Sequence, residues 1–251
     1  MGVSTHQLQN DGERSSYLSP AFAGAHAWCN EKMALAANLA DAVPLAEFFS
    51  SGALERALST YAGTKQGCDL RVAASMWSLY YFSALAIPYI LARTVEGQVL
   101  PIDFDAMTLS LAPDGLPSTF GVRDVGVLED LGGGDVFSVV GPLVEKHLRQ
   151  IVEQLRTRTG IAPRLAWNNA AVYIDYALRN SWTPTGNATV DQLVECPRIQ
   201  DGVSNPFYGC LRFEQEDGQT VCRRKVCCLR YMIPGIPSCG SLCALPNQRM
   251  Q

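Results

Sequence analysis

The chain has 251 residues, of which 47% are hydrophobic and 18% are charged. This composition excludes an intrinsically disordered or low-complexity protein, and the length is sufficient for a sizeable core. Lys and Arg number 20 against 24 Asp and Glu, a net charge of −4. A general nucleic-acid-binding protein is therefore not indicated, because such proteins usually present a basic face.

The first 20 residues, MGVSTHQLQNDGERSSYLSP, are polar and predict a flexible tail. They lack the basic start and apolar run of a secretory signal, so we expect a cytoplasmic protein. Disulfides are uncommon in a reducing cytoplasm. The cysteine count of nine is also odd, which does not favour a fully paired disulfide framework.

Three helices are predicted in the first part of the chain. Glu31–Ala42 and Leu45–Ala62 are rich in helix formers and are separated by Pro44. Val72–Ala92 is a stretch of 21 residues without a charge, which is long enough to span a bilayer. Its serines, its central tyrosines and Pro88 favour a buried core helix. Membrane contact, including peripheral association at the inner face of the cell membrane, is the alternative.

The middle of the chain predicts strands followed by helices. Between Val95 and Gly134, short β-leaning segments alternate with Pro and Gly, as in a small antiparallel sheet. Amphipathic patterns then predict helices at Pro142–Thr159 and Pro163–Asn180, with a short helix within Asn187–Glu195. The apolar stripe of the first of these includes His147, which we expect to be packed in the core.

The last part of the chain predicts a β-hairpin followed by a cysteine-rich segment. FYGCLRFE and QTVCRRKV flank a turn at Glu216-Asp217-Gly218. The predicted fold is therefore α+β: one mainly helical domain with a small antiparallel sheet and hairpin, and a C-terminal Cys-rich segment. Residues 21–205 form its body, and residues 206–251 form the hairpin and the segment that binds a metal centre.

Five of the nine cysteines fall within 22 residues near the end of the chain: Cys222, Cys227, Cys228, Cys239 and Cys243. Cys227 and Cys228 are adjacent, ten residues separate them from Cys239, and three more precede Cys243. Four thiolates can enclose a tetrahedral zinc ion or the two irons of a 2Fe–2S cluster. The other cysteines are most simply structural thiols: Cys29, Cys68, Cys196 and Cys210.

The spacing alone leaves zinc, iron–sulfur and reduced structural thiols open. Structural zinc sites usually present two short pairs of ligands with two to four residues between the members of a pair. An adjacent Cys-Cys pair fits that pattern less well, because successive residues of an extended chain point to opposite sides. Two irons lying side by side relax this demand, so the spacing favours iron–sulfur.

A family resemblance adds to this interpretation. Cys227 to Pro234 read CC-x-R-Y-x-x-P, basic residues precede them, and Trp167-Asn168-Asn169 begins a predicted helix. Together with Asn205-Pro206 and Ser75-Met-Trp77, these residues resemble the FhuF-type ferric-siderophore reductases over roughly residues 70–243. One departure is that three residues, rather than the family's usual two, separate Cys239 from Cys243, which leaves Cys222 open as an alternative fourth ligand.

The resemblance implies a 2Fe–2S cluster bound by Cys227, Cys228, Cys239 and Cys243. It implies one-electron reduction of ferric iron in a siderophore, hydroxamate type favoured, with release of ferrous iron in the cytoplasm. No glycine fingerprint for a dinucleotide is present, and Gly132–Gly134 reads as a turn, so we expect no nicotinamide or flavin and a separate electron donor. The alternatives are a non-catalytic siderophore- or metal-binding module with a structural zinc, and a membrane-associated helper of siderophore uptake.

Two further sets of residues are candidates for the site. Four cations lie within eight residues of one another: Arg223, Arg224, Lys225 and Arg230. They could tune the cluster or guide an anionic substrate or redox partner. The simpler interpretation is that they form the solvated end of a hairpin. Trp167 and Tyr231 are candidate substrate contacts. Core packing is the default interpretation for the aromatic residues Trp167, Tyr173 and Tyr176.

Overall fold

The structure is a computed structural model that describes residues 17–65, 68–199 and 202–249. Most of the predicted 1–20 tail, including His6, lies outside these residues. Leu18 and Ser19 are already buried against the body, and a short 3₁₀ turn begins at Pro20.

The core is built around one long helix, α4 (Leu70–Glu96), as predicted. The side chain of Asp69 accepts a hydrogen bond from the Arg71 amide at its start, and Gly97, in the left-handed region with φ 65°, ends it. It has the length and composition of a membrane span, but 89% of its most apolar window is buried inside the protein. The prediction of a buried core helix is thus confirmed, and Pro88 is accommodated inside the helix.

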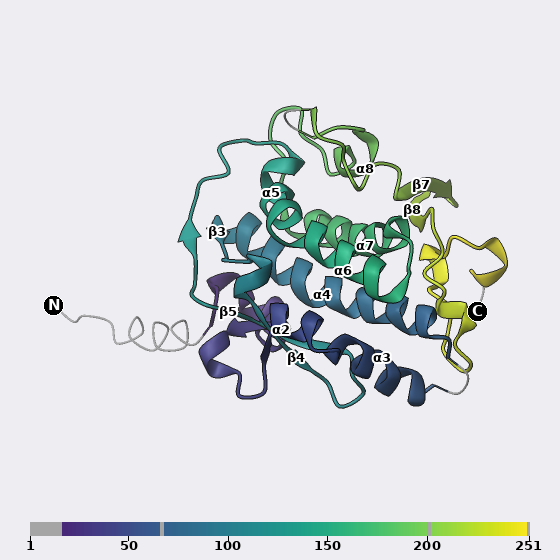
Figure 1. Cartoon of the computed structure of the whole chain (residues 1–251). Helices are drawn as coiled ribbons and strands as arrows, with labels where there is room; N and C mark the ends of the chain where they lie inside the picture. Colours follow the sequence, from purple (N-terminus) through teal and green to yellow (C-terminus); the bar gives the residue numbers. More distant parts are fainter. Residues whose placement is uncertain (1–16, 66–67, 200–201, 250–251) are drawn as a thin grey trace, which may run out of the picture.

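Helices on both sides cover α4. The helix α7 (Pro163–Ser181) runs along it and makes the most extensive contact in the molecule (Figure 1). The helix α2 (Leu45–Ser50) and the helix α3 (Ala53–Gly63) occupy the predicted Leu45–Ala62 segment and are separated at Gly52. The apolar residues of α4 thereby become buried on almost every side, which explains why its sequence is apolar all round.

Two further helices cover α4 near α7. The helix α5 (Val136–Leu143) starts earlier than the predicted Pro142, because Asp135 caps it by accepting hydrogen bonds from Phe137 and Ser138. A π-helical turn, Val144–Leu148, joins α5 to α6 (Arg149–Thr159). The predicted short helix is confined to α8 (Gln192–Glu195).

A four-stranded sheet packs against α4 in the order β1-β5-β4-β2. The strands β2 (Val43–Pro44), β4 (Thr108–Leu111) and β5 (Pro117–Val122) are antiparallel, as predicted. The strand β1 (Met33–Leu35) is not, because it pairs with β5 in parallel. Two more pairs complete the strands: β3 (Gln98–Val99) with β6 (Val127–Leu128), and β7 (Leu211–Glu216) with β8 (Gln219–Arg224).

The predicted helix over Glu31–Ala42 is wrong. In its place are β1 and a short 3₁₀ turn, Ala36–Asn38. The Phe120 amide donates to the Lys32 carbonyl at 2.8 Å, so this segment is recruited as an edge of the sheet. A side chain at Gly121 would collide with Thr108 and Ala36, so glycine is what permits the close approach. Tertiary pairing has overridden the local helix propensity.

His147 is fully buried in the π-helical turn, as predicted for a packed histidine. Its Nε2 lies 2.6 Å from the Tyr81 hydroxyl, and its Nδ1 lies 2.9 Å from the Ile102 carbonyl oxygen. A neutral ring satisfies both contacts, with Nδ1 donating to the carbonyl and Nε2 accepting from the hydroxyl. Burial lowers the pKa of His147 from 6.5 to about 4, because the charged form loses its hydration.

We expect His147 to make the protein less stable in acid. A histidine whose pKa is lower in the folded state favours folding above pH 6.5, and this contribution is lost as the pH falls toward 4. The loss amounts to about 3 kcal/mol across that window. Urea unfolding at several pH values should therefore show a steeper decline for the native protein than for His147→Gln. Parallel pH profiles of the two proteins would contradict this assignment.

Candidate metal centre

The β7–β8 hairpin carries the cysteine segment to one end of α4. Figure 1 shows the C-terminal segment, in yellow, beside the hairpin and the N-terminal end of α4. β8 ends at Arg224, and the Ser75 hydroxyl of α4 donates to the Cys228 carbonyl at 2.7 Å. This hydrogen bond joins positions 153 residues apart and fixes the backbone of the cysteine pair on the helix.

Two of the four predicted ligand cysteines are in contact, and the charges of the cysteines influence one another's pKa values. The sulfur atoms of Cys228 and Cys239 are 3.8 Å apart, and the Leu229 amide donates to the Cys227 sulfur at 3.3 Å. Cys243 is close enough for its charge to raise the pKa values of Cys227 and Cys239. Cys228 and Cys243 are buried, whereas Cys227 and Cys239 are partly exposed. All nine cysteines are unpaired in the structure.

The pair Cys228 and Cys239 is polarised. The hydrogen bond between the two thiols, with the positive charge of Arg224, lowers the pKa of Cys228 below its ordinary value. The same hydrogen bond, with burial, raises the pKa of Cys239 above its ordinary value. The geometry thus favours one thiolate before any metal binds. Among residues 17–65, 68–199 and 202–249, however, no three Cys, His, Asp or Glu side chains form a ready-made metal site.

Cys222 lies in a different environment. It stands opposite Phe213 in the hairpin, and the charged groups that influence its pKa are Asp175, Arg179 and Arg224. Burial raises the pKa of its thiol to about 11. It lines a small cavity with Tyr173, Tyr176 and Leu242, on the α7 side of the hairpin. This separate environment makes Cys243 a better candidate than Cys222 for the fourth ligand beside Cys227, Cys228 and Cys239.

Arg224 is a buried cation with no carboxylate beside it. Its side chain donates to the Asn169 amide oxygen at 2.7 Å and to the Asn168 carbonyl at 3.4 Å. The residue is only 3% exposed, and its Nε has no hydrogen-bond partner. Within the described part of the chain it forms no ion pair. A buried charge without a counter-charge is costly, so this position is suited to a nearby anionic group.

Asn169 links Arg224 to α4. Its amide nitrogen donates to the Ser78 hydroxyl at 2.9 Å and to the Ser75 carbonyl at 3.2 Å, while its oxygen accepts from Arg224. We call Ser75, Ser78, Asn169 and Arg224 the polar seam. No pattern in the sequence indicates that these residues act together. The available signal is that Ser75, Asn169 and Arg224 all belong to the motifs that carry the family resemblance.

The other predicted cations have separate roles. Arg223 is buried and ion-paired with Glu214 at 2.6 Å and with Glu216, and it also donates to the Ser241 carbonyl. Arg223 therefore holds the cysteine segment against the hairpin, and the two glutamates neutralise its charge. Arg230 donates to the Pro237 carbonyl at 2.8 Å and closes the loop between the cysteines. Lys225 is exposed to solvent.

The candidate substrate-contact aromatics lie near this end of the molecule. Trp167 is partly buried and packs edge-on against Phe207, with ring centroids 5.3 Å apart. Tyr231 is 44% exposed in the turn that follows the cysteine pair. Tyr173 is partly buried and Tyr176 is exposed, so core packing accounts for only part of this set.

Comparison with known proteins identifies one family and one relative. The family described as "Ferric iron reductase FhuF-like transporter" matches residues 75–221, more than half of the chain. A protein of Escherichia coli (strain K12) named "Ferric siderophore reductase" is 24% identical over 170 residues. That alignment covers 66% of this chain and 63% of the relative. The family match contains the polar-seam residues Ser75, Ser78 and Asn169 but ends before Cys227.

We expect loss of the Asn169 side chain to destabilise the protein. Asn169→Ala removes the amide oxygen that accepts from Arg224 and the amide nitrogen that donates to Ser78, so the buried guanidinium keeps only its longer contact with the Asn168 carbonyl. This loss should lower the free energy of unfolding by about 3 kcal/mol. Asn180→Ala, at the exposed end of the same helix, is the matched control and should cost less than about 1 kcal/mol. Urea unfolding monitored by circular dichroism would measure both, and equal losses would contradict the role of the seam.

Proposed function

Because this chain belongs to the FhuF-like ferric iron reductase family, we propose that it reduces ferric iron held by a siderophore, in the cytoplasm, with electrons from a separate donor. The family match and the name of the relative support the reductase activity. The cysteine segment supports a redox centre, because the thiols of Cys228 and Cys239 are in contact beside Arg224, a buried cation that forms no ion pair within the described residues. The single observation that carries the proposal furthest is the unpaired Arg224.

The chemistry of iron explains why one electron is enough. Hydroxamate and catecholate oxygens are hard donors that bind ferric iron tightly. Ferrous iron is less charged and softer, so the same oxygens bind it more weakly. Reduction therefore releases the metal while the chelator stays intact. This logic does not depend on which class of siderophore the protein accepts.

The cysteine residues fit a metal centre in two respects. The 3.8 Å between the Cys228 and Cys239 sulfurs equals the edge of a tetrahedron of sulfurs around a metal with bonds of about 2.3 Å. Arg224 supplies a positive charge where four thiolates would leave a net negative one. We propose that Cys227, Cys228, Cys239 and Cys243 hold a 2Fe–2S cluster. When bound, such a cluster supplies a one-electron carrier.

The protein groups around the cysteines each have a defined task in this proposal. Ser75 holds the backbone of the cysteine pair, and Arg223 holds the backbone at Ser241 in the second half of the segment. Arg224 stabilises negative charge on the thiolates. The zinc alternative satisfies the same distance and the same charge. Family membership favours the cluster, because zinc has no redox chemistry and a ferric reductase requires an electron carrier.

Serine substitutions test the ligand set. Changing Cys227, Cys228, Cys239 or Cys243 to Ser should remove bound iron and bring reduction of a ferric siderophore to background, because a hydroxyl is a poor ligand for iron. Cys222→Ser and Cys210→Ser are controls that should keep both iron and activity. Iron per protein and ferrous-iron release, trapped by a coloured ferrous chelator, are the measurements. Retention of iron by Cys243→Ser and its loss from Cys222→Ser would assign the fourth ligand to Cys222.

The midpoint potential tests the role of Arg224. Arg224→Gln removes the positive charge and should lower the potential of the metal centre, because added negative charge is then less stabilised. We expect a shift on the order of 100 mV, which corresponds to about 2 kcal/mol of charge interaction for one electron. Arg224→Lys keeps the charge and should stay close to the native value.

The comparison is made on protein that has bound its metal, by titration monitored by optical absorption. Restricting it to loaded protein separates an electrostatic effect from a loss of binding. Equal potentials in the Gln and Lys variants would show that the charge of Arg224 has no influence on the centre.

A further inference from the structure

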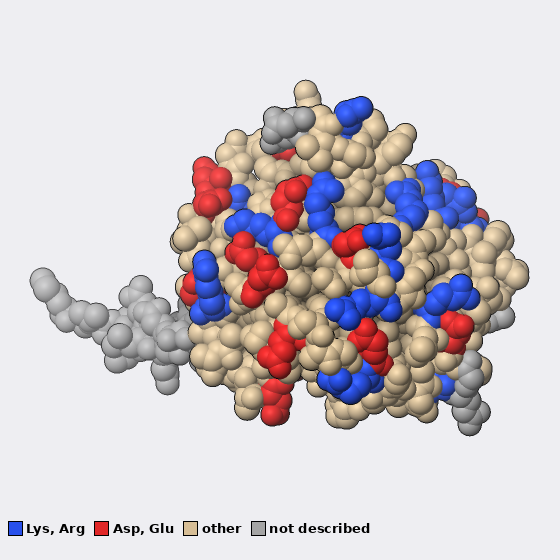
Figure 2. Space-filling model, viewed as in Figure 1, with Lys and Arg blue, Asp and Glu red and all other residues tan. Residues whose placement is uncertain are grey.

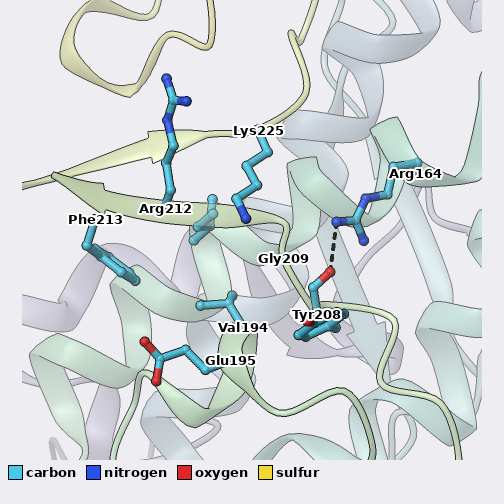
Figure 3. A pocket seen from close by; sticks show the side chains of 9 residues that line it. Arg164, Val194, Glu195, Tyr208, Gly209, Arg212, Phe213 and Lys225 are labelled. Atoms are coloured by element: carbon cyan, nitrogen blue, oxygen red, sulfur yellow. Dashed lines mark hydrogen bonds between the residues drawn. The ribbon is translucent and has the colours of Figure 1, made fainter.

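A cavity of about 670 Å³ opens where the start of α7, the end of α8 and the hairpin meet. Its volume is in the range of small-molecule sites. Three cations line it, Arg164, Arg212 and Lys225, against one carboxylate, Glu195 (Figure 3). Figure 2 shows Lys and Arg side chains gathered over the region of the hairpin, on a protein whose net charge is −4. The cavity is thus a local concentration of positive charge.

Two of these cations converge on Gly209. A Cβ atom built at Gly209 would lie 3.4 Å from Arg164 Nη2 and 3.5 Å from Lys225 Nζ. Figure 3 shows both side chains directed toward this residue from opposite elements. Gly209 has a φ of 60°, which glycine adopts without strain, and its missing side chain keeps this space open.

Neither converging cation has an acidic partner. Arg164 donates to the Tyr208 carbonyl at 2.7 Å, and in the described residues neither it nor Lys225 forms an ion pair. Arg212, by contrast, is ion-paired with Glu214. Two like charges that point into the same space repel each other, and an anion bound between them would offset this repulsion.

The cavity lies next to the proposed metal centre. Lys225 is two residues before Cys227, and its amide donates to the Cys210 carbonyl at 2.9 Å. Arg164 precedes Trp167 and the asparagines that hold Arg224, on the same helix. A ligand held by Arg164 and Lys225 is therefore placed at the edge of the cysteine segment. Tyr208 and Phe213 add aromatic surface to the wall.

We propose that this cavity binds a carboxylate carried by the ferric siderophore, so that the preferred substrates are anionic ferric chelates. This inference rests on the function proposed above and adds the substrate class. Arginine recognises a carboxylate through paired hydrogen bonds, and lysine adds a point charge. The hydroxamate preference expected from the sequence concerns the iron-binding groups, whereas this site recognises charge elsewhere on the chelator.

A matched pair of chelates tests the proposal. A linear trihydroxamate whose terminal amine is acetylated forms a neutral ferric complex, and the succinylated form differs by one free carboxylate. Both present the same oxygens to the metal. Loading them with gallium(III) in place of iron prevents reduction, so calorimetry of the full-length protein measures binding alone. We expect the native protein to bind the succinylated complex about tenfold more tightly, a difference of about 1.4 kcal/mol.

Substitutions then locate the preference. Arg164→Gln and Lys225→Gln should each weaken binding of the succinylated complex several-fold, and the double variant should bind the two complexes equally. Lys146→Gln, an exposed cation outside the cavity, is the control and should keep the native preference. Circular dichroism should show all of these variants folded, because the substituted side chains are exposed.

Three results would overturn the proposal: no preference in the native protein, a preference that survives in the double variant, or variants that impair only electron delivery by a protein donor. The last would assign the cations to the donor's docking surface. Failure of the proposed function is distinguishable, because a protein that binds the gallium complexes with the expected preference yet reduces no ferric chelate retains this site and lacks the activity.

Discussion

A buried guanidinium without a carboxylate is the constraint on which this account depends. Arg224 lies between α7 and the cysteine segment, with two asparagines satisfying part of its hydrogen bonding. Those amides remove some of the desolvation cost but none of the charge. The positive charge of Arg224 lowers the pKa of the Cys228 thiol, a group that can become anionic. The protein thus holds a buried positive charge beside the Cys228 thiol.

The fold holds this charge in place through rigid elements. The helix α4 is buried along most of its length, and α7 packs against it, so the polar seam between them has little freedom to move. Through Ser75 the seam also holds the backbone of the cysteine pair. Arg223, although adjacent in sequence, points into a pair of glutamates and acts as a clamp. Adjacent arginines on a strand face opposite sides, which explains why their roles differ.

Local patterns predicted much of the fold and little of the seam. The long apolar run, the amphipathic helix after Pro163 and the hairpin around Asp217-Gly218 are all present as expected. The segment around Met33 was misassigned because its partner strand is far away in the sequence, at Phe120. The helix predicted from Pro142 starts earlier in the structure, because the Asp135 side chain caps α5 ahead of the first helical turn that the proline pattern indicates.

The site shows the same division. The proposed set of ligand cysteines can be predicted from the spacing and the resemblance, because both are visible in the sequence. The separate environments of Arg223, Arg224 and Lys225 cannot be predicted in this way, because each depends on contacts with distant residues. Asn169 and Ser75 are 94 residues apart, and no periodicity connects them. The convergence of Arg164 and Lys225 on Gly209 is equally non-local.

The most direct test of the central claim is spectroscopic. The protein would be purified without oxygen, analysed for iron and acid-labile sulfide, and reduced with dithionite for electron paramagnetic resonance. The account predicts a red-brown protein with two irons and two sulfides per chain, silent when oxidised and paramagnetic with one electron when reduced. A colourless protein that contains one zinc ion per chain and stays silent under reduction would contradict it.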